Sequence, residues 1–182
     1  MKKVLKNDFI TTKWSGGTTS QIFIDPIDAD VAKKDFDFRI SSATCELESS
    51  IFTPYGDFNR FITPIDGSLK LTVNGEDVFL KPYDIYFFDG SDDVVSEGKV
   101  RDYNLIVRKG HNGSMYAKYL ENDRLVIDSN YKNIVIFNYD GDFTYAYRGN
   151  INEFEDFSSV VLVKNESIDI KGTGHLLICE IE

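Results

Sequence analysis

The segment GSLKLTVNGEDVFLKPYDIYFFDG, residues 67–90, decides the fold. It contains three short runs of apolar, β-branched and aromatic residues, which are the residue types that favour β-strands. Asn74-Gly75 separates the first two runs, and a turn that contains Pro82 separates the last two. Asn, Gly and Pro favour turns through the backbone angles that they adopt. The segment therefore predicts a strand, a turn, a second strand, a Pro-containing turn and a third strand.

The same pattern continues on both sides of this segment. Further turn dipeptides occur at Asp66-Gly67, Asp89-Gly90, Asn112-Gly113 and Asp140-Gly141. Ile, Val, Phe, Tyr and Trp account for 56 residues, whereas Ala, Leu and Met account for only 18, and this ratio favours a sheet protein. Only residues 30–35 and 150–156 look briefly helical. Many short strands at this spacing predict an all-β sandwich or barrel rather than a parallel α/β sheet.

A faint internal repeat indicates how the strands are divided. Residues 157–181, FSSVVLVKNESIDIKGTGHLLICEI, repeat the order strand, turn, strand, turn, strand, and Asn165 opens the first turn as Asn74 does. We therefore predict two small β-barrels, or jelly rolls, packed in one chain. The first covers residues 1–110 and carries the pocket, the second covers residues 111–182, and strands are exchanged between them. Chance similarity between two runs of β-hairpins is the alternative.

The composition limits the class of partner and the compartment. The net charge is −10 and the pI is near 4.7; such a chain repels polyphosphate, so nucleic acid and anionic membrane surfaces are poor partners. The only cysteines, Cys45 and Cys179, lie in apolar runs and indicate buried thiols rather than a disulfide framework. The N-terminal MKKVLKNDFI lacks the apolar stretch of a signal peptide, and no window reaches the ~18 apolar residues of a membrane span. We expect a cytoplasmic protein.

Four sequence blocks carry a resemblance to a known family. They are Trp14-Ser15-Gly16-Gly17-Thr18-Thr19, Phe38-Arg39-Ile40-Ser41-Ser42-Ala43, Gly56-Asp57-Phe58-Asn59-Arg60 and Gly98-Lys99-Val100-Arg101-Asp102-Tyr103-Asn104-Leu105. Over residues 10–110 their order and spacing resemble those of the HutD/Ves family, whose members are bicupins of the cupin superfamily. The C-terminal third is similar only in its β character.

The resemblance carries expectations about function. It implies an accessory or regulatory role near amino-acid catabolism of the histidine type, with urocanate or formylated glutamate as ligands. By analogy with cupin-like barrels, it also implies a homodimer. The chain departs from the family at one point, because the family commonly has an Arg-Glu pair directly after the two threonines, where this chain has Ser20-Gln21. If that pair shapes the charge of the pocket, the ligand preference of this chain differs.

The alternation of side chains along two strands selects polar residues that share a face. Arg39 and Ser41 lie two residues apart, as do Asp102 and Asn104, and residues at this spacing point to the same side of a strand. A cation inside a barrel is costly unless a carboxylate or an anionic ligand meets it. An ion pair between Asp102 and Arg39 or Arg60 is the purely structural alternative.

Arg60 is the sharpest candidate for contacting a ligand. It follows a turn-like segment and begins an apolar strand, and at a barrel mouth its fork of donors suits a carboxylate. Trp14, the glycines after it and the two threonine hydroxyl groups would suit a small planar or carboxylated molecule; core packing is the alternative role for Trp14. The predicted ligand-binding set is Trp14, Thr18, Thr19, Arg39, Ser41, Arg60, Asp102 and Asn104, with Arg60 as the anchor of the carboxylate and Asn104 and the hydroxyl groups orienting the rest.

Neither a metal site nor a catalytic group stands out. Metal-dependent cupins present several histidines, whereas this chain has only His111 and His175, so we expect no metal and no other cofactor. No histidine lies at a telling spacing from a serine or cysteine nucleophile, and no catalytic residue is assigned. The leading prediction is a metal-independent protein that binds a small carboxylate metabolite without turnover. The alternatives are a metal-free isomerase or hydrolase with Asp102 as general base and a protein-interaction module whose acidic surface docks a basic partner.

Overall fold

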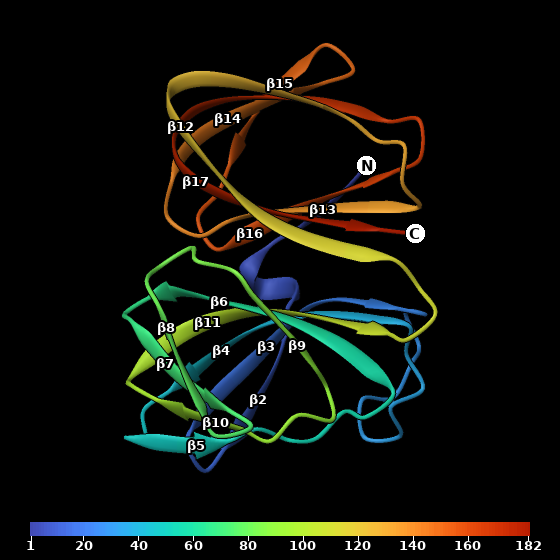
Figure 1. Cartoon of the computed structure of the whole chain (residues 1–182). Helices are drawn as coiled ribbons and strands as arrows, with labels where there is room; N and C mark the ends of the chain where they lie inside the picture. Colours follow the sequence, from blue (N-terminus) through green and yellow to red (C-terminus); the bar gives the residue numbers. More distant parts are fainter. The chain divides into compact units, whose positions relative to one another are not determined.

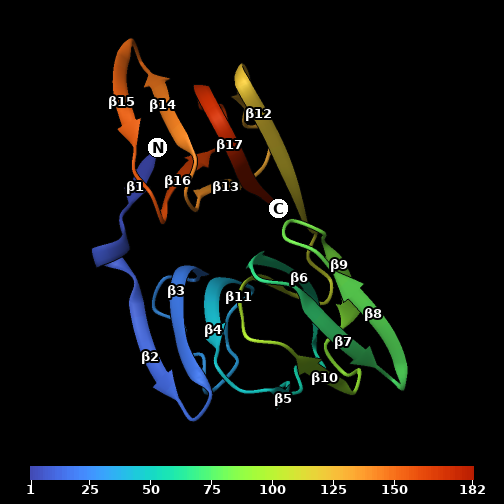
Figure 2. The same ribbon diagram turned by 90° about the vertical axis from the view of Figure 1, so that its left-hand side faces the viewer.

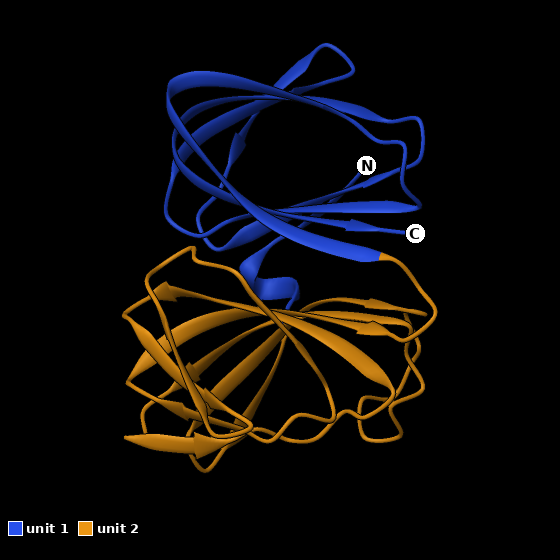
Figure 3. Cartoon of the chain, viewed as in Figure 1, with its two compact units in different colours: residues 1–9, 113–182 blue, residues 10–112 orange.

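The computed structural model describes residues 1–182 and divides them into two compact units (Figure 3). Unit 1 consists of Met1–Phe9 and Gly113–Glu182, and unit 2 consists of Ile10–Asn112. Apart from the short 3-10 helix η1 (Lys6–Asp8), the regular structure is entirely β (Figure 1). The chain forms no helix with the length and apolarity needed to cross a bilayer.

Unit 2 is built from two antiparallel sheets that curve around a common interior (Figure 2). The larger sheet has the order β2 (Ile10–Trp14), β3 (Gly17–Asp25), β4 (Phe38–Cys45), β11 (Val100–Arg108), β6 (Phe58–Asp66) and β9 (Tyr86–Asp89). The smaller sheet has the order β5 (Ser49–Ile51), β10 (Val94–Glu97), β7 (Leu69–Val73) and β8 (Glu76–Leu80).

The segment that decides the fold connects these two sheets. Its first two runs are β7 and β8, which pair directly across the turn Asn74-Gly75. Both turn residues have positive φ, 51° and 88°, as a two-residue hairpin turn requires. The third run is β9, which leaves the smaller sheet and pairs with β6 in the larger one. The predicted order of strands and turns is confirmed.

The apolar side chains between the two sheets of unit 2 hold them together. Ile62 of the larger sheet packs with Leu69 and Leu71 of the smaller sheet in one buried cluster, to which Val94 and Val100 also belong. Burial of each such side chain contributes on the order of 1.5–3 kcal/mol. This cluster fixes the positions of the strands that carry the polar interior described below.

Unit 1 is a second all-β body. Its sheet has the order β1 (Lys2–Val4), β16 (Ser158–Val163), β13 (Asn133–Asn138), β17 (Ser167–Ile181), β14 (Asp142–Tyr147) and β15 (Asn150–Phe154), and β12 (Gly113–Asp128) pairs with β17. The long strands β12 and β17 stay in register except for a bulge between Leu120 and Asp123. Ile134, Ile136 and Leu162 belong to its apolar core, and Asn138, Ser158 and Ser159 are polar residues buried in the same unit.

Three local expectations differ from the structure. Residues 150–154, expected to be helical, form the strand β15, which pairs with β14 from Tyr147–Asn150 to Phe143–Phe154. Residues 30–35, also expected to be helical, form turns and irregular backbone. Residues 1–9, expected in the first barrel, belong to unit 1, where β1 pairs with β16.

Candidate functional site

A cavity of about 380 Å³ opens in the interior of unit 2. Its polar wall is the concave face of the larger sheet, where the strand register places side chains in three rows across β3, β4, β11 and β6. The rows are Thr19, Ala43 and Asp102; Ser41 and Asn104; and Arg39, Ile106 and Arg60. Side chains in one row lie opposite each other on neighbouring strands and are therefore within contact distance.

Arg60 is the most enclosed cation of the cavity. Only 8% of it is exposed, and its guanidinium carbon lies 4.9 Å from the ring centre of Phe52, 5.0 Å from that of Phe88 and 5.7 Å from that of Tyr55. Its hydrogen bonds go to uncharged oxygens, with Nη2 donating to Asn104 Oδ1 at 3.2 Å and Nη1 to a backbone carbonyl at 3.5 Å. Its Nε has no partner. Burial lowers the pKa of Arg60 to about 10, although Asp102 and Tyr55 oppose this shift.

Asp102 lies behind Arg60 in the same hydrogen-bonded chain. Asn104 Nδ2 donates to Asp102 Oδ1 at 2.5 Å, so the amide of Asn104 stands between the guanidinium and the carboxyl group. Burial raises the pKa of Asp102 to about 7, despite the opposing effects of a backbone hydrogen bond from Ala43 and of the charge on Arg60. The carboxyl group therefore titrates close to neutral pH.

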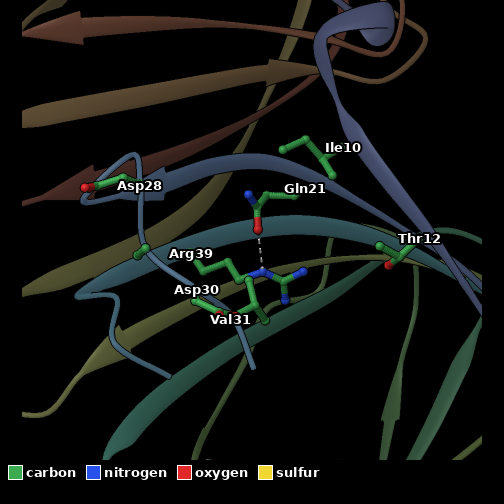
Figure 4. Close-up of a pocket in the computed structure, with 8 residues that line it drawn as sticks. Ile10, Thr12, Gln21, Asp28, Asp30, Val31 and Arg39 are labelled. Atoms are coloured by element: carbon green, nitrogen blue, oxygen red, sulfur yellow. Dashed lines mark hydrogen bonds between the residues drawn. The ribbon is translucent and has the colours of Figure 1, made fainter. Parts of the chain in front are cut away.

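Arg39 lines this cavity and also a second hollow of about 430 Å³, whose lining residues Figure 4 shows. Its Nε donates to Gln21 Oε1 at 3.1 Å, as the dashed line in Figure 4 shows. Gln21 pairs with Ser41 on the neighbouring strand, which places it diagonally across from Arg39 on the same face of the sheet. Burial also lowers the pKa of Arg39. Neither predicted ion pair, Arg39–Asp102 or Arg60–Asp102, forms a direct contact.

Of the eight residues predicted to bind a ligand, the structure brings seven to this cavity. Trp14, Thr19, Arg39, Ser41, Arg60, Asp102 and Asn104 all line it. Thr18 does not, because its hydroxyl group is hydrogen-bonded to Thr44 Oγ1 at 2.9 Å on the opposite face of β3. Trp14 is 38% exposed, and its ring covers Gly16, where an added Cβ would lie 2.2 Å from the ring.

Comparison with protein families matches residues 6–178 of the chain to the HutD family. The chain belongs to the HutD family. No curated protein matches its sequence. Among solved structures, a conserved protein of unknown function from Pseudomonas aeruginosa PAO1 is similar to it with a TM-score of 0.84 and 19% identity, over 100% of this chain and 98% of that one.

Two further solved structures have a fold similar to that of this HutD family member. HutD from Pseudomonas fluorescens SBW25, solved in a formate condition, has a TM-score of 0.77 and 22% identity over 100% of this chain and 98% of that one. A cupin 2 conserved barrel domain protein from Leptotrichia buccalis has a TM-score of 0.64 and 13% identity over 100% of this chain and 96% of that one. The predicted all-β cupin fold and the family are thus confirmed.

Sequence reasoning missed the aromatic residues that enclose Arg60. Phe52 and Tyr55 line the cavity of this HutD family member from the segment between β5 and β6. They lie outside any strand, so no alternation of side chains marks them. The available signal was weak: both residues lie within the eight positions that precede Arg60, and aromatic rings close to an arginine supply cation–π contacts.

The arrangement in this HutD family member suits an anion. Two arginines with depressed pKa values face one cavity, and both donate only to uncharged oxygens. The described residues contain no group of three or more His, Cys, Asp or Glu placed to hold a metal ion. His111 lies beside Asp37 in unit 2, whereas His175 belongs to β17 of unit 1.

Proposed function

We propose that this HutD family member binds a small carboxylate metabolite in the cavity of unit 2, without metal and without turnover. The observation that carries this proposal is the environment of Arg60, a buried guanidinium that has no carboxylate in contact and an Nε without a partner. A buried cation is costly unless an opposite charge meets it. A ligand carboxylate that enters from the cavity would supply that charge.

The groups around Arg60 support a small, flat or short ligand. The rings of Phe52, Phe88 and Tyr55 surround the guanidinium and exclude water, which strengthens a charge-assisted hydrogen bond. Ser41 and Thr19 present hydroxyl groups from the neighbouring rows. These groups can orient the uncharged part of the ligand.

Membership of the HutD family suggests a role related to histidine utilisation. We infer that the protein acts there as an accessory or regulatory component that senses a carboxylate, with urocanate and formylated glutamate as the ligands to test first. Formate belongs in the same panel, because the P. fluorescens HutD structure was solved in a formate condition.

Thermal unfolding against a panel of carboxylates tests this proposal. A ligand at ~100 times its Kd adds about 2.7 kcal/mol to the free energy of unfolding, which corresponds to a shift of several degrees for a chain of this size. The shift should disappear in Arg60→Ala and persist in Arg124→Ala, which removes an arginine in unit 1 that pairs with Asp169. No shift with any carboxylate, or an equal shift in Arg60→Ala, would contradict the proposal.

A second candidate function is supported by Asp102. A carboxyl group with a pKa of about 7 inside a cavity is suited to general-base catalysis. In that case ligands of the panel would be converted, and Asp102→Asn would abolish conversion while leaving binding in place. Absence of turnover, measured by NMR on each bound compound, would remove this candidate.

A further inference from the structure

The guanidinium group of Arg39 keeps hydrogen-bond donors that no neighbouring side chain uses. Its Nε donates to Gln21 Oε1, and the guanidinium makes no other hydrogen bond within the chain. The terminal nitrogens Nη1 and Nη2 can therefore donate to an incoming group. Because Arg39 lines both hollows, a ligand in the main cavity can reach it.

No carboxylate neutralises Arg39. Asp28 and Asp30 line the second hollow, but the Asp28 carboxylate points away from the guanidinium in Figure 4. Asp30 accepts a hydrogen bond from the backbone N–H of Ala32 at 2.8 Å, and its other oxygen lies 3.8 Å from Lys33 Nζ. The phenol of Tyr55 is the group that counteracts the effect of burial on the pKa of Arg39.

Arg39 and Arg60 are also placed to act on one molecule. They belong to the same row, with Ile106 of β11 between them. Two interstrand spacings separate their Cα atoms by about 10 Å, and the side chains extend from the same face into one cavity. The positive charge of Arg39 contributes to the depressed pKa of Arg60, so the two guanidinium groups share one electrostatic environment.

We propose that Arg39 is a second anion subsite, that Gln21 is the residue that keeps it available, and that the ligand of this chain is a dicarboxylate held between Arg60 and Arg39. This inference rests on the proposed function, because it adds a second subsite to the carboxylate site. The amide of Gln21 orients the guanidinium without cancelling its charge, whereas a glutamate of the same shape would do both. Gln21 thus determines specificity.

The test compares a dianion with a monoanion of similar shape. Affinities for glutarate and for butyrate are measured by calorimetry, at constant ionic strength, in the wild type and in Gln21→Glu. The wild type should bind glutarate at least tenfold more tightly than butyrate. In Gln21→Glu, glutarate affinity should fall about tenfold, because the new carboxylate occupies Arg39, while butyrate affinity should stay within twofold.

A second variant protects the test against a folding defect. Arg39→Gln removes the second cation and should give the same selective loss of glutarate affinity, whereas Arg60→Ala should lose both ligands. If both ligands bind the wild type and the variants at position 21 or 39 affect them equally or not at all, the second subsite is refuted and the carboxylate site stands. If neither ligand binds the wild type although another carboxylate of the thermal-unfolding panel does, the second subsite is refuted and the carboxylate site stands. If no carboxylate binds at all, the proposed function fails, and the second subsite fails with it.

Discussion

Replacing Asp102 by Asn should stabilise the protein above neutral pH and should have little effect in acid. The folded state raises the pKa of Asp102 from 3.8 to about 7, mainly through burial. Between these two values the folded protein keeps a proton that the unfolded chain releases. The free energy of unfolding therefore decreases as the pH rises from about 4 to about 7, and this contribution is constant above that range. Asn cannot ionise, so Asp102→Asn lacks the decrease.

The size of the effect follows from the separation of the two pKa values. About three pKa units at 1.36 kcal/mol each give an upper limit of roughly 4 kcal/mol. Asp102 is only 7% exposed, so screening by solvent is weak, but the amide must replace the carboxyl group in its hydrogen bonds with Asn104 and Ala43. We expect a net gain of roughly 2–3 kcal/mol at pH 8.5, which is a rise in Tm of about 5–10 °C.

Urea unfolding of both proteins at pH 4.5, 6, 7 and 8.5 measures this difference directly. The difference should grow with pH up to about 7 and then remain level. Asp77→Asn serves as a control of opposite sign, because hydrogen bonds from Thr72 and Lys70 lower the pKa of that carboxyl group, so its replacement should reduce stability at neutral pH. The reasoning is refuted if Asp102→Asn is less stable than the wild type at pH 8.5, or if the difference does not change with pH.

Three further predictions concern the same unit. The affinity of the cavity for a carboxylate should fall as the pH rises from 6 to 8, because ionised Asp102 adds negative charge beside the ligand. Calorimetry of Asp102→Asn should show no such fall. The same pH dependence in the variant as in the wild type would contradict this prediction. Gly17→Ala should lower the free energy of unfolding in urea by about 2–4 kcal/mol, because the added Cβ would lie 2.0 Å from the Thr44 carbonyl oxygen at a φ of +155°. Gly75→Ala, at a φ of +88° with open space around it, should lower it by about 1 kcal/mol. Equal losses would argue against the close approach of Gly17 to Thr44. Thr18→Val should lose about 1 kcal/mol of stability with its hydrogen bond to Thr44 yet keep the full carboxylate response in thermal melts, and a lost response would show that Thr18 contacts the ligand.

The fold could be predicted wherever the signal was local. A two-residue hairpin turn requires positive φ at both central residues, and Asn74 and Gly75 are residue types that tolerate these angles, so the β7–β8 hairpin has a local signal. Residues 150–154 follow a turn of the same kind, Arg148-Gly149, with φ values of 49° and 81°, but Arg-Gly is a weaker hairpin signal than Asn-Gly. Likewise, nothing within residues 1–9 indicates that β1 pairs with β16, because the partner of a short edge strand is decided by the rest of the sheet.

In the candidate site, too, features within one strand could be predicted from the sequence, whereas contacts between strands could not. Alternation along a strand brings Arg39 and Ser41 to one face, and the same rule separates Thr18 from Thr19, since neighbouring residues point to opposite sides. Thr18 and Thr19 therefore cannot both face the cavity, and the prediction that both bind the ligand is inconsistent with this alternation. Contacts between strands are different in kind, because the register between β11 and β6 decides that Asn104, rather than Asp102, meets Arg60.

That position of Asn104 is what separates a binding site from a structural ion pair. A guanidinium only donates hydrogen bonds, so the amide oxygen of Asn104 faces Arg60 and its nitrogen faces Asp102. The amide satisfies both neighbours and keeps the Asp102 carboxyl group out of contact with the guanidinium, so Asp102 only partly offsets the cost of burying the charge of Arg60. Had Asp102 contacted Arg60 directly, an entering carboxylate would have had to displace the Asp102 carboxylate and leave that buried charge without its partner, which is costly. With the amide between them, the carboxylate of the proposed ligand would instead offset the cost of the buried charge on Arg60.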